Sequence, residues 1–234
     1  AIAGIAVGTV SLPILSKAIK TKNILKVSNI QNKSIELSLM LSIPASLGLI
    51  LASEQIINAL FGYGSFSEKN IEMTAEALKY FGYGIPAFAL IKILSNFFFA
   101  RDDTKTPFYI SVFVVLSNIF ISLTFFKEIG FVIIAIATSV STWFGVIIYV
   151  LLLQKKKLLL IKPNLFMNIL KIILSTIIMS LILWFFLDYF SQSLEYTDKF
   201  KSVYLLFIVS FVATIYLITC YLLRVLKIKN YRAN

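Results

Sequence analysis

The sequence contains no histidine, a single cysteine and few charged side chains. Without histidine, and with Cys220 as the only thiol, the chain has neither an internal disulfide nor a metal site built from Cys and His ligands at their usual spacing. Cys220 is therefore interpreted as a small apolar residue of a helix. Charged residues make up 14% of the chain, whereas a soluble domain carries about 25%.

Apolar residues dominate instead. Of the 234 residues 59% are hydrophobic, and the mean hydropathy is +0.90. A water-soluble core cannot hide that much apolar surface, so the composition predicts a membrane protein. The net charge of +11 would suggest nucleic acid in a soluble protein. Here the basic residues fall between apolar segments, which favours a role in membrane orientation and no nucleic-acid partner.

The apolar segments predict an all-α integral membrane protein, a polytopic bundle of six full transmembrane helices and one truncated helix. About 20 apolar residues are needed to cross a bilayer. The first segment lacks an initiator Met and a basic leader, so we interpret it as the second half of a span in a C-terminal fragment of a longer protein. The predicted spans are Ala1–Ser16 (partial), Ile35–Leu60, Met73–Ala100, Pro107–Phe126, Gly130–Leu153, Leu165–Phe190 and Ser202–Val225.

The basic residues alternate strongly between the two sides of these spans. One side carries 16 of the 22 Lys and Arg and only three of the 11 acidic residues. The opposite side carries five basic residues, and Lys92 lies within a span. Because cytoplasmic loops are enriched in Lys and Arg, the 16-charge side is predicted to be cytoplasmic, with the C-terminus inside.

The charged loop between the third and fourth segments, "ARDDTKTP", allows three interpretations. It can be a solvated helical turn, in which Thr106 caps the next helix and Pro107 occupies its first turn. It can be a headgroup or ion site. It can also be an acidic metal–diphosphate motif, although such sites need several Asp at helical spacing and this loop offers one adjacent pair.

The same loop, "FFFARDDTKTP", resembles the "FYxRxDTKTP" signature of the MurJ (MviN) family of bacterial lipid II flippases. Two further stretches agree. "GTVSLPILSK" (residues 8–17) is similar to the family's eighth helix and its exit, and "LFGYGSFS" (residues 60–67) to its turn between helices nine and ten. Order and spacing match helices eight to fourteen of a fourteen-helix protein.

The resemblance implies a fold and an activity. Residues 1–153 would form the C-terminal lobe of a transporter core related to the MATE antiporters, and residues 154–234 a basic linker with two extra helices. The family flips undecaprenyl-diphosphate-linked peptidoglycan precursor (lipid II) across the bacterial inner membrane by alternating access, without covalent chemistry, so it is not an enzyme. Membrane lipids and the cell-wall synthesis machinery are the other expected partners. A cation-coupled drug antiporter or an O-antigen-type flippase of the same superfamily is the alternative.

Three residues near the loop are predicted to contact the anionic cargo. Lys92 lies nine residues before Arg101, about 13 Å from the helix end, where a lysine is costly and usually functional. The alternative is a lysine that extends its side chain towards the headgroups. Asn96 is one turn closer to the loop and shares the face of Lys92. The arginines on which the family's cavity depends would lie upstream of this chain.

An ion site is the second prediction. Asn118 and Ser122 are four residues apart on the fourth predicted segment, and Thr138 lies on the fifth. Several oxygen ligands could bind sodium, although no carboxylate lies beside them. Hydrogen bonding between the helices is the competing interpretation. No cofactor is predicted, and coupling to sodium or to the membrane potential stays open.

The last two spans carry no charge between Lys171 and Asp188. The resemblance implies that they form a groove for the lipid tail. A hydrocarbon chain offers no polar group, so such a groove should be apolar and shaped by small residues beside bulky ones. The candidate small residues are Ser175, Ser180, Ser210 and Ala213.

Overall fold

The computed structural model describes residues 2–64 and 66–225, and every regular element among them is a helix. Lys227, Lys229 and Arg232, which contribute to the predicted charge bias, lie outside the described residues. The helices are α1 (Ile2–Lys20), α2 (Ile24–Leu51), α3 (Ser53–Phe61), α4 (Glu68–Phe99), α5 (Lys105–Ile129), α6 (Val132–Lys155), α7 (Pro163–Tyr189), the 3-10 turn η1 (Gln192–Leu194) and α8 (Lys201–Leu222).

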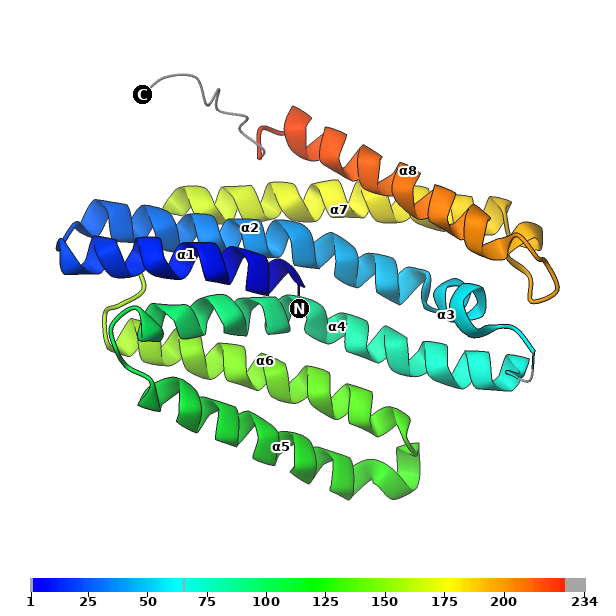
Figure 1. The fold of residues 1–234 in the computed structure, drawn as a ribbon, viewed down its shortest axis with the longest axis horizontal. Coiled ribbons are helices and arrows are strands. Elements are labelled where there is room, and N and C mark those ends of the chain that lie inside the picture. Colours follow the sequence, from blue (N-terminus) through cyan, green and yellow to red (C-terminus); the bar gives the residue numbers. More distant parts are fainter. Residues whose placement is uncertain (1, 65, 226–234) are drawn as a thin grey trace.

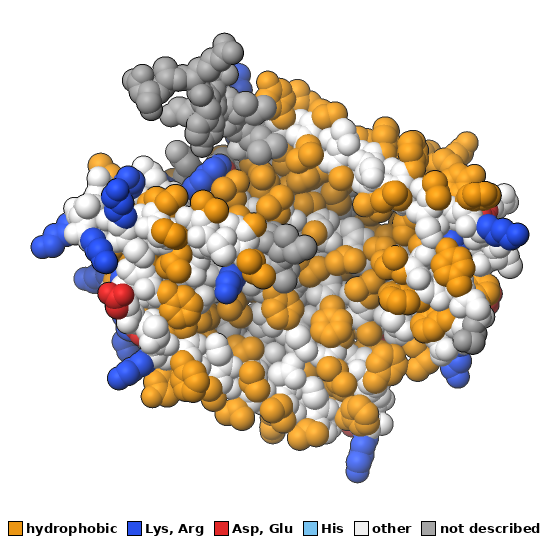
Figure 2. All heavy atoms as spheres, viewed as in Figure 1, with side chains coloured by type: hydrophobic (Ala, Val, Ile, Leu, Met, Phe, Trp, Pro, Cys, Tyr) orange, Lys and Arg blue, Asp and Glu red, His pale blue; other side chains and the backbone are white. Residues whose placement is uncertain are grey.

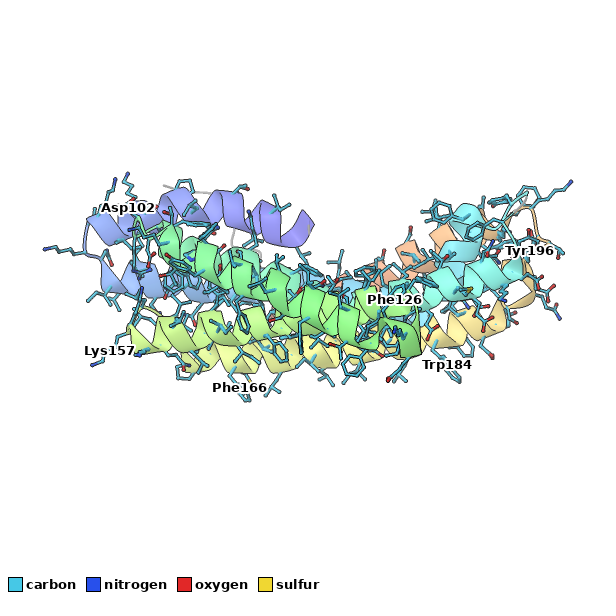
Figure 3. The ribbon with its side chains drawn as sticks, turned by 90° about the horizontal axis from the view of Figure 1, so that it is seen from below. Asp102, Phe126, Lys157, Phe166, Trp184 and Tyr196 are labelled. Atoms are coloured by element: carbon cyan, nitrogen blue, oxygen red, sulfur yellow. The ribbon has the colours of Figure 1, made fainter. Side chains whose placement is uncertain are left out.

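The long helices run roughly along one axis of the molecule (Figure 1). α2 is central, because it packs against α1 and α4 on one side and α7 on the other. α6 packs on α4, and α5 packs on α6 at the edge of the bundle. α8 lies along α7 and also packs on α3 and η1. Asp102 and Lys157 mark one end of the bundle and Tyr196 the other (Figure 3).

Six of the described helices are long and apolar enough to cross a membrane by length and composition: α2, α4, α5, α6, α7 and α8. The predicted all-helical membrane fold with six full spans is therefore confirmed. Figure 2 shows the apolar surface that this composition leaves outside the bundle. α5 exposes the most apolar surface, since only 6% of its most apolar 18-residue stretch is buried inside the protein.

The second predicted span, Ile35–Leu60, is wrong at both ends. α2 begins at Ile24, eleven residues earlier, and ends at Leu51, and residues 53–61 form the separate helix α3. The early turns of α2 carry polar residues that resemble a loop in the sequence, but Gln31, Asn32 and Glu36 are buried against other segments. Their polar groups are satisfied by tertiary hydrogen bonds, so the helix continues through them.

The buried apolar residues form two large clusters on either side of α2. One, which includes Leu15, Phe97 and Tyr149, joins α1, α2, α4, α5 and α6. The other, which includes Met179 and Ile208, joins α2 and α3 to α7 and α8. The division of the chain at residues 153 and 154 stays a prediction, because both clusters draw on α2.

Candidate functional site

Asn96 fastens α4 to α1. Its amide Nδ2 donates to the carbonyl oxygen of Gly8 at 2.9 Å, and its side chain is 4% exposed. The two helices approach closely because α1 has glycine at the contact. A Cβ added to Gly4 would lie 3.0 Å from the Cα of Ala89, and one added to Gly8 would lie 3.0 Å from Asn96 Nδ2. Asn96 thus already has a structural partner in this state.

Lys92 is exposed on α4 beside the same stretch of α1. Its side-chain stem passes Gly8, since a Cβ there would lie 3.5 Å from Lys92 Cγ. Among the described residues it takes part in neither of the two ion pairs. The structure therefore places Lys92 next to Asn96 and α1, on a surface where its ammonium is available to an anion.

Arg101 is half-buried where α4 ends. Its guanidinium donates to the carbonyl oxygens of Phe97, at 2.5 Å, and of Leu158, at 3.4 Å. Burial lowers the pKa of Arg101 from its usual value. A guanidinium has five N–H donors, so most of them stay available for other acceptors. Arg101 lies at the helix end and does not meet Lys92, nine residues earlier on α4.

The start of α5 is capped by Asp103 and not by Thr106 as predicted. The Asp103 carboxylate accepts from the Thr106 backbone N at 3.0 Å and from the Thr106 hydroxyl at 2.8 Å, and it pairs with Lys156 Nζ at 3.0 Å. The backbone hydrogen bond from Thr106 is the main reason why the pKa of Asp103 falls to about 2. The buried Pro107 lies within the first turn, as predicted. The loop is a capped helical turn.

The predicted ion-site residues are partly brought together. Asn118 Nδ2 donates to Thr138 Oγ1 at 2.9 Å, and the Thr138 hydroxyl donates to the Ile134 carbonyl at 2.6 Å. The hydroxyl of Ser122 is buried without a hydrogen-bond partner among the described residues. Asn118 and Thr138 therefore make the interhelical bond of the competing interpretation, while the Asn118 and Ser122 oxygens remain available to a ligand.

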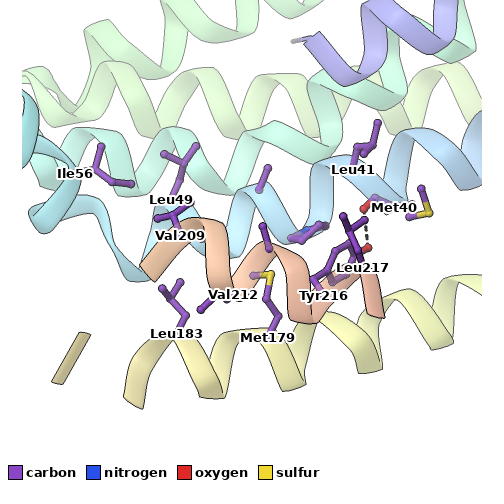
Figure 4. A pocket seen from close by; sticks show the side chains of 14 residues that line it. Met40, Leu41, Leu49, Ile56, Met179, Leu183, Val209, Val212, Tyr216 and Leu217 are labelled. Atoms are coloured by element: carbon purple, nitrogen blue, oxygen red, sulfur yellow. Dashed lines mark hydrogen bonds between the residues drawn. The ribbon is translucent and has the colours of Figure 1, made fainter. Parts of the chain in front are cut away.

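An apolar groove of about 380 Å³ opens between α2, α7 and α8 (Figure 4). Pro44, Ala45 and Gly48 of α2 form part of its floor, and α7 and α8 form its walls. The hydroxyl of Tyr216 donates to the carbonyl of Met40, another lining residue, at 2.6 Å. The full lining is Met40, Leu41, Pro44, Ala45, Gly48, Leu49, Ile56, Met179, Leu183, Val209, Val212, Ala213, Tyr216 and Leu217.

Of the four small residues predicted for a tail groove, Ala213 lines it. Ser175 is fully buried, Ser180 is half-buried and Ser210 is exposed, and the structure places all three outside the lining. The small residues that shape the groove lie mostly on α2, which sequence reasoning had not connected with the last two helices. The proline and glycine inside the apolar stretch of α2 were the available signal.

Sequence reasoning also missed how the basic linker is held. Residues 158–162 run without helix or strand along the first turns of α2. Gln31 donates to the Leu158 carbonyl at 2.8 Å and accepts from the Leu160 N–H at 3.2 Å. Asn32 donates to the Leu160 carbonyl at 2.6 Å and accepts from the Lys162 N–H at 2.9 Å. Two side chains thus serve the linker backbone as a neighbouring strand would.

A second missed residue, Lys201, closes the opposite end of the bundle. Its side chain is 1% exposed. The ammonium donates to Asn58 Oδ1 at 3.0 Å, to the Gly62 carbonyl at 2.6 Å and to the Tyr196 carbonyl at 2.8 Å. It also lies 4.3 Å from the ring centroid of Tyr63 and 4.8 Å from that of Tyr196. The three N–H donors of the ammonium thus have three oxygen acceptors, and the ammonium lies between two aromatic rings.

Comparison with known proteins gives consistent results. The family model described as "Lipid II flippase MurJ" matches residues 1–218. The probable lipid II flippase of Rickettsia prowazekii (strain Madrid E) is 34% identical over 236 residues, which cover 98% of this chain and 45% of that protein. That of Rhizobium tropici is 39% identical over 146 residues, 62% of this chain and 27% of that protein.

A solved structure, "Lipid II flippase MurJ, inward closed conformation", matches with a TM-score of 0.75 at 28% identity. The match covers 95% of this chain and 44% of that chain. The chain thus spans less than half the length of these relatives.

Proposed function

Because the chain belongs to the lipid II flippase MurJ family, we propose that it forms part of a protein that moves lipid II from the inner to the outer leaflet of the bacterial cytoplasmic membrane. Lipid II is an amphiphile with an undecaprenyl tail, a diphosphate and a disaccharide-peptide head. Moving it requires a path for the polar head and a place for the tail, and no covalent bond changes. The strong bias of basic residues supports a cytoplasmic C-terminus.

The apolar groove between α2, α7 and α8 is the observation that carries this proposal. A polyprenyl chain presents only hydrocarbon, so its site has to be recognised by shape and apolar contact. The groove is lined by aliphatic side chains, and its one hydroxyl, on Tyr216, is occupied by a backbone carbonyl. In a bilayer, such a groove is an alternative to bulk lipid for a hydrocarbon chain.

The polar head would meet the α1–α4 surface. Lys92 is exposed there and can pair with a diphosphate, while Asn96 positions α1 through Gly8. Arg101 lies farther along at the helix end, where its remaining N–H donors can contact the cargo on entry. These roles extend the sequence-based prediction and distinguish a direct contact, Lys92, from a positioning residue, Asn96.

Transport of lipid II needs an energy source, and sodium is one candidate. Asn118 of α5 meets Thr138 of α6, and Ser122 lies one turn further along α5; the oxygens of these three side chains are the candidate sodium ligands of this chain. Coupling to the membrane potential would need no such site. The drug-antiporter alternative is not favoured by any of the comparisons above, all of which match lipid II flippases.

The groove is tested by filling it. In the intact protein, Ala213→Trp should place an indole in the groove and reduce flipping of fluorescent lipid II in proteoliposomes at least tenfold. Ile218→Trp is the matched control, because Ile218 is on the same helix, is 52% exposed and does not line the groove. Normal flipping by the Ala213→Trp protein, at normal folded yield, would remove the groove from the transport path.

A further inference from the structure

A second groove, at the loop end of the bundle, differs from the tail groove in having a cationic rim. It has a volume of about 440 Å³ and lies where α1 ends, α2 begins and α4 ends, beside the linker. Lys22, Arg101 and Lys157 contribute its charges. The rest of its lining is apolar: Ile19, Ile24, Val27, Leu158 and Leu160. None of the eight lining residues is acidic.

The three cations come from three separate segments and have no acidic partner. Neither ion pair in the described part of the chain involves them. Arg101 is held in place by the carbonyls of Phe97 and Leu158, with most of its N–H groups unused. The fold therefore brings three cations to one groove, and none of them forms an ion pair within the described part of the chain.

The backbone at the two lysines is also unusual. Lys22 has φ +52° and Lys157 has φ +54°, in the left-handed region where glycine is the relaxed residue. Both follow the ends of helices, α1 and α6, and both line the groove. Helix termination explains the conformation but not the choice of lysine, since Gly or Asn usually occupies this position. Asp102 and Arg224 adopt the same conformation after α4 and α8 without lining the groove, so the groove is identified by its charges and its lining and not by this conformation.

We propose that this groove binds the headgroup of an anionic glycerophospholipid of the surrounding membrane. The phosphate would lie among Lys22, Arg101 and Lys157, and the upper acyl chain would follow Ile24 and Val27. Basic pockets between transmembrane helices are known to bind anionic headgroups. A soluble phosphate would leave the apolar floor uncovered, so an amphiphile fits the lining better. The site would tie the linker that leads to α7 to the lipid composition of the membrane.

The site shares Arg101 with the proposed entry of the cargo but is otherwise separate from the cargo path, and its test does not depend on flipping. Lys92 does not line it, and the tail groove lies along the second half of α2 and α8. The helix dipole favours cations near the C-terminus of a helix, which is the competing explanation for the position of these residues. The control residues must therefore lie at the same helix ends but outside the groove. Lys20 and Lys155 meet this condition, because both are exposed, lie in the last turns of α1 and α6 and do not line the groove.

The test uses Ile24→Trp in the intact protein, because Ile24 lines the groove and is 68% exposed. The protein is reconstituted in phosphatidylcholine vesicles that contain rising fractions of brominated phosphatidylglycerol or brominated phosphatidylcholine. Bromine quenches a nearby indole, and the same protein without the substitution supplies the background. Brominated phosphatidylglycerol should be preferred about tenfold over brominated phosphatidylcholine.

The Lys22→Gln/Lys157→Gln pair should bring this preference to within about twofold of unity, while Lys20→Gln/Lys155→Gln should keep it. Equal quenching of the Ile24→Trp protein by the two lipids overturns the proposal. This comparison needs no lysine variant, so it does not depend on whether those variants fold. An equal loss in both variant pairs also overturns it, because charge near the surface would then suffice. Displacement of the lipid by inorganic phosphate, or preferentially by farnesyl diphosphate, overturns it in favour of a soluble anion or the cargo.

Discussion

Lys201→Met should open the end of the bundle at which α3 meets the α7–α8 hairpin. Methionine keeps the length and apolar stem of lysine but removes the ammonium. The carbonyls of Gly62 and Tyr196 and the Oδ1 of Asn58 then lose their buried donor. Asn58 also donates to the Leu194 carbonyl at 2.8 Å, so the disturbance reaches η1.

The size of the effect follows from two opposing costs. Hydrogen bonds from a charged donor contribute about 1.5–3 kcal/mol each, and there are three. Burying one ammonium costs several kcal/mol after relaxation. The contacts with two aromatic rings and the carbonyls at the end of α3 favour the cation further. The balance is a net local contribution of about 2–4 kcal/mol.

Hydrogen–deuterium exchange in nanodiscs measures this opening. A loss of about 2 kcal/mol raises the population of the open state about 30-fold, so the amides around η1 and the end of α3 should exchange at least that much faster. Lys199→Met is the control, because Lys199 is exposed and only two residues away. If the Lys201→Met protein exchanges no faster than this control, the ammonium is not what closes this end.

Two further predictions concern topology and cargo. Cysteine at Lys155 should resist an impermeant thiol reagent applied to intact cells, and cysteine at Gln192 should react; labelling of both from outside would contradict the assigned orientation. Lys92→Ala should reduce lipid II flipping at least tenfold in the intact protein, and Lys92→Arg less, whereas Lys155→Ala should have little effect. Normal flipping by Lys92→Ala at normal protein level would make Lys92 a lipid-facing lysine without a role in the cargo path.

The number of spans was predictable because apolar length is a local property of the sequence. A run of about 20 apolar residues has few alternatives to a transmembrane helix, and six such helices are present among the described residues. The beginning of α2 was not predictable in this way. Gln31 and Asn32 look like loop residues until residues 158–162, more than 120 positions later, provide their partners. That pairing joins residues far apart in the sequence, so the periodicity of a single helix cannot predict it.

The candidate sites show the same difference. The depth of Lys92 could be counted from the helix end, and the pairing of Asn118 with Thr138 was anticipated as one of two interpretations. The tail groove required the rotation of α7 and α8 about their own axes, which packing on α2 decides. Ser175 therefore faces the core, while Ala213 faces the groove. Lys201 is one of the five basic residues counted on the side opposite the 16, and its burial could not be predicted because its acceptors come from α3, Gly62 and Tyr196.

If the groove takes a lipid chain, as proposed above, the last two helices do so while both ends of their hairpin stay attached to the core. The α7–α8 hairpin is fixed at one end by the linker on Gln31 and Asn32, and at the other by Lys201. Between these two attachments the groove is lined by apolar side chains, and one directional bond crosses from α8 to α2, from the Tyr216 hydroxyl to the Met40 carbonyl. This bond holds α8 on α2 along the groove, and the two attachments hold the ends of the hairpin on the core. A hydrocarbon chain would enter from the bilayer at the middle of the hairpin and displace only apolar contacts.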